Sequence, residues 1–141
     1  MLTKTIIITA ATGTLAISPV PALAQPAHPL IERGDTLVVY ERIGGYAGLH
    51  DKITIDRDGR AVVSAAKTTD FMLTTGEYRD LRRALDQITS TWSSSSGCEI
   101  ADHFTYSIQY RGWQASRCHE PPQDWTAAVK QLDSLIDGSA W

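Results

Sequence analysis

The sequence is poor in cysteine, in excess charge and in long hydrophobic runs. Two cysteines in 141 residues exclude a small scaffold held together mainly by disulfides, and 10 glycines and 6 prolines are too few for a collagen-like or low-complexity chain. Thirteen basic against 16 acidic residues give a net charge of −3, which provides no basic surface for nucleic acid. The length and the 43% of hydrophobic residues are those of one ordinary globular domain.

The one hydrophobic run lies at the start of the chain and has the pattern of a secretory signal peptide. Lys4 precedes an apolar run over residues 5–17, and Ala22 and Ala24 are small residues at the two positions that a signal peptidase requires. An uncleaved membrane anchor or a buried helix is the alternative, but the run is shorter than the roughly 20 residues that span a membrane. We expect cleavage after Ala24, which removes residues 1–24, and export of the mature chain to the periplasm or the medium, without a membrane anchor.

The two cysteines, Cys98 and Cys118, form an even pair in a chain that we expect to be exported. Export places them where disulfides persist, so we expect one bridge that ties the end of a serine-rich loop to the end of a later strand. The alternative is a metal site, for which the candidate ligands are Cys98, Glu99, Asp102, His103, Cys118 and His119. Their spacing matches no standard zinc pattern, so we expect neither a metal nor a cofactor.

The segments after the signal peptide predict a short lead-in and a single domain. Residues 25–35 contain two prolines and a glycine and no periodicity, which indicates a flexible lead-in to a domain over residues 36–138. Four β-rich segments separated by turn residues come first: 36–42, 49–56, 60–67 and 70–73. A stretch that alternates aromatic and polar residues then predicts a strand over 103–110, and a glycine turn joins it to a strand over 113–118.

Two helices are predicted, one after the fourth strand and one at the end of the domain. Thr74 stands three residues before Glu77, a capping-box pattern, and apolar residues then recur at helical spacing: Tyr78, Leu81, Leu85 and Ile88. The second helix follows Pro121-Pro122, ends at Gly138 and has its own apolar stripe: Trp125, Ala128, Val129, Leu132, Leu135 and Ile136. Each helix is apolar on one side only and needs a sheet to cover. The expected fold class is α+β, with an antiparallel β-sheet (meander plus C-terminal hairpin) and two helices packed on one face.

The sequence contains no arrangement of residues typical of an enzyme. The serines at 93–96 lack the Gly-x-Ser-x-Gly pattern of a nucleophile, and the four histidines are scattered. Asp56 and Asp58 lie in a turn that favours aspartate for backbone reasons. The residues by themselves therefore favour a noncatalytic binding module. A small hydrolase with an unrecognised site is the alternative, and turnover abolished by a single His or Ser substitution would reveal it.

A glycine-rich stretch after the first predicted strand resembles the E-R-x-G-G-[FY]-A-G signature of the emfourin family: Glu41-Arg42-Ile43-Gly44-Gly45-Tyr46-Ala47-Gly48. Members of this family are small bacterial inhibitors of protealysin and related thermolysin-like metalloproteases. Three further segments resemble the family's second strand and turn, its D-x-F-x-Y strand and its closing helix: residues 54–59, 102–106 and 121–135. The resemblance covers most of residues 36–136. It implies a noncatalytic inhibitor that occludes the active site of a metalloprotease.

The glycine-rich turn has two interpretations. In one it only joins two strands, with Tyr46 packed inward, because glycines allow positive φ and close backbone approach. In the other it forms one edge of the inhibitory surface, because thermolysin-like enzymes cleave beside bulky apolar side chains. The loop pinned by Cys98 is a second candidate, since its carboxylates would approach the catalytic Zn²⁺ as oxygen ligands. The candidate partner-binding residues are Gly44, Gly45, Tyr46, Gly48, Leu49, Glu99 and Asp102.

The partner implied by the resemblance is a thermolysin-like metalloprotease, and we expect the free protein to be a monomer. The alternative is a noncatalytic periplasmic or secreted domain that binds something else or has a structural role, with no protease target. A gene for a protealysin-like protease beside the gene of this protein would favour inhibition.

Overall fold

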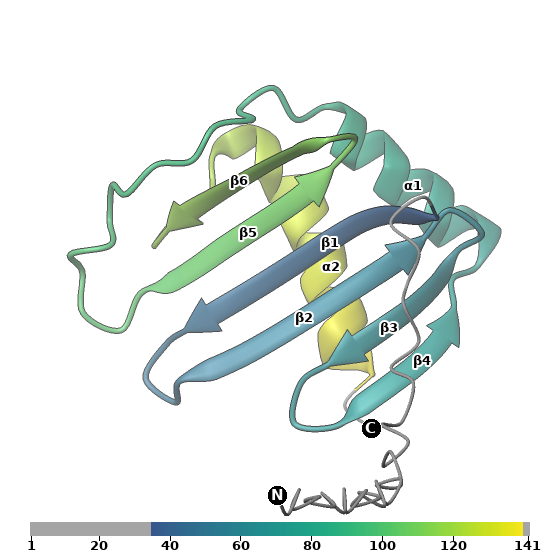
Figure 1. Ribbon diagram of the computed structural model, residues 1–141, viewed down its shortest axis with the longest axis horizontal. Coiled ribbons are helices and arrows are strands. Elements are labelled where there is room, and N and C mark those ends of the chain that lie inside the picture. Colours follow the sequence, from purple (N-terminus) through teal and green to yellow (C-terminus); the bar gives the residue numbers. More distant parts are fainter. Residues whose placement is uncertain (1–34, 140–141) are drawn as a thin grey trace, which may run out of the picture. The chain divides into compact units, whose positions relative to one another are not determined.

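The computed structural model describes residues 35–139, which form six strands, two α-helices and one 3₁₀ turn (Figure 1). The elements are β1 Thr36–Gly44, β2 Leu49–Asp56, β3 Arg60–Ser64, β4 Thr68–Met72, α1 Thr75–Asp86, β5 Phe104–Tyr110, β6 Trp113–Cys118, η1 Gln123–Trp125 and α2 Thr126–Gly138. The signal peptide expected at residues 1–24, and the lead-in up to residue 34, lie outside the described residues. No helix within residues 35–139 is long and apolar enough to cross a membrane.

The six strands form one antiparallel sheet in the order β4-β3-β2-β1-β5-β6. The first four strands are a meander, in which each strand pairs with the next along the chain. The last two are a hairpin that adds to the free edge of β1, so β1 is central and pairs with both β2 and β5 (Figure 1). The sheet and its two helices confirm the predicted α+β fold class.

Alternation along the central strands gives the sheet one apolar face. Val38 and Tyr40 of β1 are fully buried, and Tyr40 lies opposite Ile53 of β2 and Ile108 of β5, which are also fully buried. Because side chains alternate along a strand, the residues between them point to the other face, which the helices leave uncovered. The aromatic side of β5 belongs to the buried face: Tyr110 is 2% exposed and contacts the core, and Tyr106 is partly buried against it.

Helix α1 begins where the sequence predicts and ends earlier. The Thr74 hydroxyl accepts a hydrogen bond from the Glu77 amide (3.2 Å), and the Glu77 carboxylate accepts one from the Thr74 amide (2.8 Å), which completes the capping box. The amides of Gln87 and Ile88 bond to carbonyls three residues back, so the chain tightens and leaves the helix after Asp86. The assignment of Ile88 to the helix is therefore wrong, although its side chain still packs into the core.

Helix α2 covers the same face of the sheet and follows the turn η1. Trp125, at the end of η1, is fully buried and its indole nitrogen donates to the carbonyl of Ser90 (2.9 Å). The buried residues of the two helices and of the sheet form one core: Val38, Tyr40, Ile53, Ile55, Ala61, Val63, Leu73, Leu81, Ala84, Leu85, Ile88, Ile108, Tyr110, Ala115, Trp125, Ala128, Val129, Leu132 and Ile136. The predicted apolar stripe of α2 is confirmed, with Leu135 at its partly buried margin.

Several strand boundaries differ from the predicted ones. β1 continues to Gly44, because this residue still pairs with both neighbouring strands. β3 ends at Ser64 rather than 67, because the Ala65 amide bonds to the Lys67 carbonyl (3.1 Å) and turns the chain. β4 consequently starts at Thr68, two residues before the predicted start. β5 begins at Phe104, so His103 belongs to the preceding loop and not to a strand face.

Candidate partner-binding surface

The two segments singled out in the sequence lie side by side at one end of the sheet. Gly44 is opposite Leu49 on one side and Phe104 on the other, so the β1–β2 turn and the loop that enters β5 meet there. The amide of Gly45 donates to the carbonyl of His103 (3.0 Å) and joins them directly. We call residues 43–49 and 97–103 together the loop end of the molecule; it is at the left of Figure 1.

The glycines of the turn allow this close approach. Gly44 has a φ of 120°, and a Cβ atom there would overlap the carbonyl oxygen of His103. Gly45 has a φ of 72°, and a Cβ atom would lie 2.6 Å from the ring of Phe104. Both conformations favour glycine, and both sites leave no room for a side chain. Two of the candidate residues therefore shape the surface rather than contact a partner through side chains.

The turn presents apolar side chains to solvent. Tyr46 is 94% exposed, so the interpretation in which it packs inward is wrong. Leu49 is 41% exposed, and two neighbours that the sequence analysis did not select are similar: Ile43 at 43% and Ile100 at 41%. Ile43 could have been found from strand alternation. Arg42 points toward the helices, so the next residue, Ile43, lies on the face away from them. Ile100 follows the acidic Glu99 in a loop that shows no strand or helix periodicity.

The loop over residues 97–103 is held by covalent and polar contacts. The predicted disulfide between Cys98 and Cys118 is present and attaches the loop to the end of β6. The imidazole Nδ1 of His103 lies 2.8 Å from the carbonyl oxygen of Ile100, which closes the loop on itself. Asp102 adopts a φ of 57° in the left-handed region. Glu99 and Asp102 are both exposed, so their carboxylates stand in solvent on a fixed backbone.

Three of the residues weighed as metal ligands also gather in this loop. The donor atoms of Cys98, His103 and Cys118 lie within 4.8 Å of one another. Both sulfurs are bonded to each other in the disulfide, so neither offers the thiolate that binds a metal. Oxidation therefore leaves the imidazole of His103 as the one ordinary metal ligand of this group.

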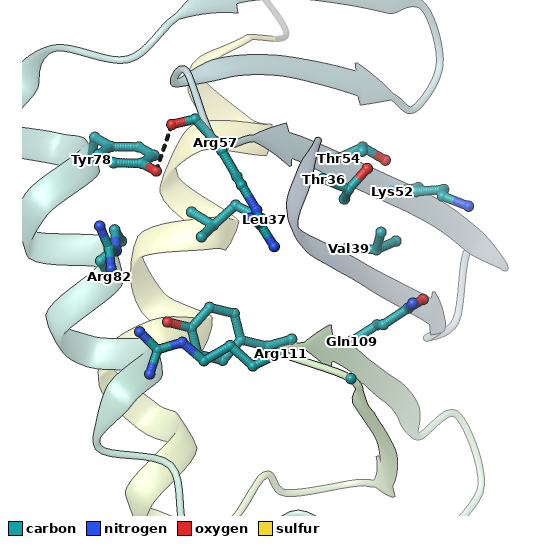
Figure 2. A pocket seen from close by; sticks show the side chains of 12 residues that line it. Thr36, Leu37, Val39, Lys52, Thr54, Arg57, Tyr78, Arg82, Gln109 and Arg111 are labelled. Carbon is teal, nitrogen blue, oxygen red and sulfur yellow. Dashed lines mark hydrogen bonds between the residues drawn. The ribbon is translucent and has the colours of Figure 1, made fainter. Parts of the chain in front are cut away.

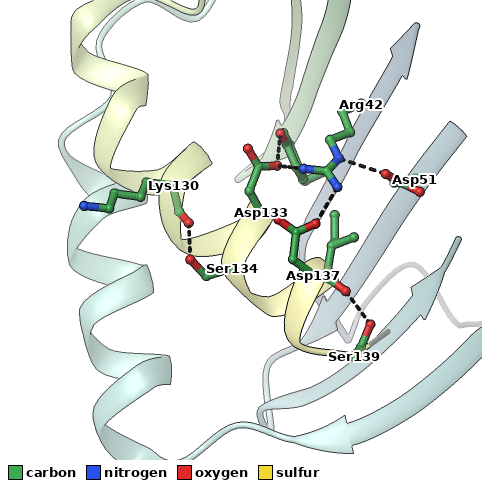
Figure 3. Close-up of polar contacts among 9 residues, drawn as sticks. Arg42, Asp51, Lys130, Asp133, Ser134, Asp137 and Ser139 are labelled. Atoms are coloured by element: carbon green, nitrogen blue, oxygen red, sulfur yellow. Dashed lines mark hydrogen bonds and ion pairs between the residues drawn. The ribbon is translucent and has the colours of Figure 1, made fainter. Parts of the chain in front are cut away.

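A charged network lies behind the turn, between the sheet and α2 (Figure 3). The guanidinium of Arg42 contacts three carboxylates: Asp51 (2.8 Å), Asp133 (3.1 Å) and Asp137 (2.7 Å). The Tyr40 hydroxyl donates to Asp133 (2.7 Å). Asp51 is 7% exposed, so its ion pair with Arg42 offsets the cost of burying the carboxylate. The network ties β1 and β2 to α2, and the sequence analysis gave Arg42 no such role.

Burial sets the protonation behaviour of this network. It raises the pKa of Asp133 above its ordinary value, although the hydrogen bond from Tyr40 and the charge of Arg42 act in the opposite direction. Burial, together with the bond to Asp133, also raises the pKa of Tyr40, which keeps its hydroxyl protonated as a donor. Arg42 of the glycine-rich motif is thus a structural residue that attaches the strand before the turn to α2.

A pocket at the opposite end of the sheet contains none of the predicted site residues (Figure 2). It is lined by ends of β1, β2 and β5 and by α1, and it has four basic side chains: Lys52, Arg57, Arg82 and Arg111. Two of them are neutralised, because Lys52 pairs with Glu41 (2.9 Å) and Arg111 with Asp86 (3.1 Å). The other two extend from exposed positions at the rim, so the pocket has no enclosed charge of its own.

No model of a known protein family matches the chain, and no curated protein matches it either. The class defined by the structure is therefore an α+β domain whose distinctive feature is the loop end: apolar side chains on a glycine turn beside acidic side chains on a disulfide-anchored loop.

Proposed function

We propose that the protein is an exported inhibitor of a thermolysin-like zinc metalloprotease and acts by occluding the active-site cleft with its loop end. The observation that carries the proposal is the meeting of two segments. The glycine turn, which resembles the emfourin signature, and the loop pinned by Cys98 form one surface, from which Tyr46 is 94% exposed.

The loop end has the apolar groups that a protease cleft of this class accepts. Ile43, Leu49 and Ile100 expose about two fifths of their surface each, at 43%, 41% and 41%, beside the exposed Tyr46. Leu49 lies on the same face of the sheet as Ile53, and Ile43 lies on the opposite face, so these side chains flank the end of the sheet on both sides rather than forming one patch. Thermolysin-like enzymes prefer bulky apolar side chains next to the scissile bond, so one of these residues would occupy that subsite.

The backbone beneath these side chains is already ordered. The Gly45–His103 hydrogen bond joins the two loops, and the disulfide fixes the second one. An inhibitor with a preorganised surface loses less conformational entropy on binding, which improves affinity. The same rigidity slows cleavage of the inhibitor by the protease, because a bound loop must change its backbone conformation before its peptide bond is hydrolysed.

The acidic residues of the second loop supply the polar part of the contact. The carboxylates of Glu99 and Asp102 are exposed on the loop, and carboxylate oxygens are ligands that Zn²⁺ accepts. In the proposed complex one of them approaches the catalytic zinc while the apolar side chains fill the adjacent subsite.

A titration against thermolysin and protealysin tests the proposal. The protein is expressed with its first 24 residues, recovered after export and titrated while hydrolysis of a fluorogenic peptide is followed. We expect stoichiometric loss of protease activity with the inhibitor uncleaved, and an amino terminus at Gln25. Tyr46→Ala, Leu49→Ala and Glu99→Ala should each weaken inhibition at least tenfold, about 1.4 kcal/mol.

Met72→Ala is the matched control, because Met72 is 60% exposed on the far edge strand β4 and lies away from the loop end. It should inhibit like the wild type. Absence of inhibition of both enzymes at micromolar excess would overturn the proposal, as would equal weakening by the control.

A further inference from the structure

Arg117 of β6 is an enclosed cation without a polar partner. The residue is 6% exposed, and its Nη1 nitrogen is buried with no hydrogen-bond partner among residues 35–139. No carboxylate in that range forms an ion pair with it, in contrast to Arg42 and Arg111. A buried charge without a partner is costly to a protein, so its retention calls for a physical explanation.

Two indole rings cover the guanidinium without satisfying it. Its Cζ atom lies 5.1 Å from the centroid of Trp92 and 5.7 Å from that of Trp125. Such cation–π contacts stabilise the charge, but a ring face accepts no in-plane hydrogen bond. A guanidinium has five N–H donors arranged in a fork. The Nη1 nitrogen of Arg117 therefore has no acceptor among residues 35–139, and a ligand carboxylate would supply one.

A cavity of about 530 Å³ opens directly beside this side chain, under the loop that follows α1. Its wall contains Arg117, the exposed indole of Trp92 and three serines: Ser90, Ser94 and Ser96. The Ser94 amide donates to the Ser116 carbonyl (3.0 Å), which holds this wall against β6. The size is within the range of small-ligand sites, and the wall combines one cation, hydroxyl groups and an aromatic face.

Acidic side chains at the rim restrict the charge of the ligand. Glu99 and Glu120 also line the cavity, and both are exposed. A single buried guanidinium beside two carboxylates favours an anion with one negative charge over a doubly charged phosphate. Carboxylates also match the planar fork of arginine with two parallel hydrogen bonds.

We propose that this cavity binds a carboxylate, with the carboxyl group on Arg117 and the apolar part of the ligand against Trp92. The ligand is a small organic acid or the free carboxyl terminus of a peptide, which share this chemistry. The cavity shares Gly97, Glu99 and Ile100 with the loop end, but the proposal does not rest on protease inhibition, because its binding groups, Arg117 and Trp92, lie outside the loop end.

Titrations with four probes test the proposal on the oxidised full protein. The probes are benzoate, inorganic phosphate, and one pentapeptide prepared with a free and with an amidated carboxyl terminus. Tryptophan fluorescence includes the two rings that flank Arg117 among the four indoles of the chain, so the Nε–Hε resonance of Arg117 is the specific report on the guanidinium. We expect saturable changes in both signals with benzoate, with the free-carboxyl peptide or with both, and the pattern identifies the source of the carboxylate.

Phosphate should bind at least about tenfold more weakly than the carboxylate, a difference in binding free energy of about 1.4 kcal/mol. The amidated peptide should give no change. Equal binding of phosphate, or of the amidated peptide, would overturn the assignment of a carboxylate. No saturable change with either carboxylate probe would show that Arg117 serves only to stack between the rings.

Three variants separate binding from folding. Arg117→Met replaces an unpaired buried charge by an apolar chain of similar length, so the fold should persist while binding is lost. Trp92→Ala alters a 63% exposed ring and should weaken binding about tenfold. Arg111→Met is the matched control, since Arg111 also stacks on a ring, Tyr110 at 5.2 Å, but at the other end of the sheet. Binding that survives Arg117→Met, or is lost in Arg111→Met, would contradict the proposal.

Discussion

At the scale of single residues, the glycines of the β1–β2 turn differ in what surrounds them. Gly44 lies in strand register between two neighbours, with the His103 carbonyl where a Cβ would be. Gly48 has a φ of 61°, but nothing lies within 4 Å of the position of its Cβ. The first glycine is required by both the backbone and the packing, and the second by the backbone alone.

We therefore expect Gly44→Ala and Gly48→Ala to have unequal costs. Gly44→Ala combines backbone strain of about 1–3 kcal/mol with overlap of about 1–3 kcal/mol, so it should lower the free energy of unfolding by about 3 kcal/mol. Gly48→Ala should cost about 1 kcal/mol, the penalty of a left-handed alanine. Urea unfolding of both variants measures the difference, and equal losses would show that the His103 contact does not constrain the turn.

The residues that sequence analysis missed depend on contacts between distant parts of the chain. Arg42 bonds to Asp137 across 95 positions, and no local pattern connects the two. Arg117 occupies an inward position of β6, where the alternation predicts an apolar residue, and only the structure brings Trp92 to its ring-stacking position. By contrast, Gly44, Tyr46 and Leu49 could be selected as candidates from the sequence, because the turn is a continuous local motif.

At the scale of secondary-structure elements, the charged network attaches α2 to the sheet. Arg42 of β1 and Asp51 of β2 lie opposite each other in the strand register, and Asp133 and Asp137 are one turn apart on α2. The side chains meet because residues four apart share one helix face. The apolar stripe of α2 determines which face points inward, and this network adds polar contacts to the interface, together with the hydrogen bond from the Thr69 hydroxyl to the Ser139 carbonyl after the helix (3.4 Å).

The raised pKa of Asp133 gives this attachment a defined pH dependence. A carboxyl group with a higher pKa in the folded state binds its proton more tightly when folded. Its contribution to stability is fully present below the unfolded pKa, about 3.9 for Asp, and is lost as the pH rises through the folded pKa. In Asp133→Asn this titration is removed.

The free energy of unfolding of the wild type relative to Asp133→Asn should therefore fall as the pH rises from about 3 to about 7. Urea unfolding across that range provides the measurement. Asp137→Asn is the control for loss of one charge from the network, because the Asp137 side chain is 65% exposed. A relative stability that rises with pH would contradict the burial of Asp133.

Most helices and strands could be predicted from the sequence, but the order in which the strands pair in the sheet could not. The capping box predicted the start of α1, alternation of apolar residues predicted the bounds of β2, and the glycine turn at Arg111-Gly112 predicted those of β6. The predicted ends of elements were wrong after Asp86 and Ser64. At both places backbone hydrogen bonds turn the chain, and such bonds leave no pattern in the sequence. The pairing of β1 with β5 joins segments separated by α1 and a long loop, so no local pattern could specify it.

At the scale of the whole molecule, the buried core and the loop end are separate. None of the buried core residues within residues 35–139 lies between Ile88 and Ile108. The segment between them is held at the β6 edge by the Ser94 and Ser116 contacts, by the carboxylate of Asp124 and by the disulfide. The fold thus supplies a stable platform, and a few polar contacts and one covalent bond set the conformation of the loop that we propose for binding.

Removal of the disulfide should therefore separate stability of the fold from order in the loop. A bridge between residues 20 apart contributes about 3 kcal/mol by restricting the unfolded chain, so Cys98→Ala/Cys118→Ala should lose about that much and still unfold cooperatively. Hydrogen exchange should become faster at the amides of residues 97–103, while those of Val38 and Tyr40 in the central strand remain protected. Inhibition of the protease should weaken as hydrogen exchange in the loop becomes faster. The glycine turn should keep its conformation, but it forms only half of the proposed surface. Loss of cooperative unfolding would show that the loop belongs to the core after all, and unchanged exchange in the loop would show that its hydrogen bonds, rather than the disulfide, hold it in place.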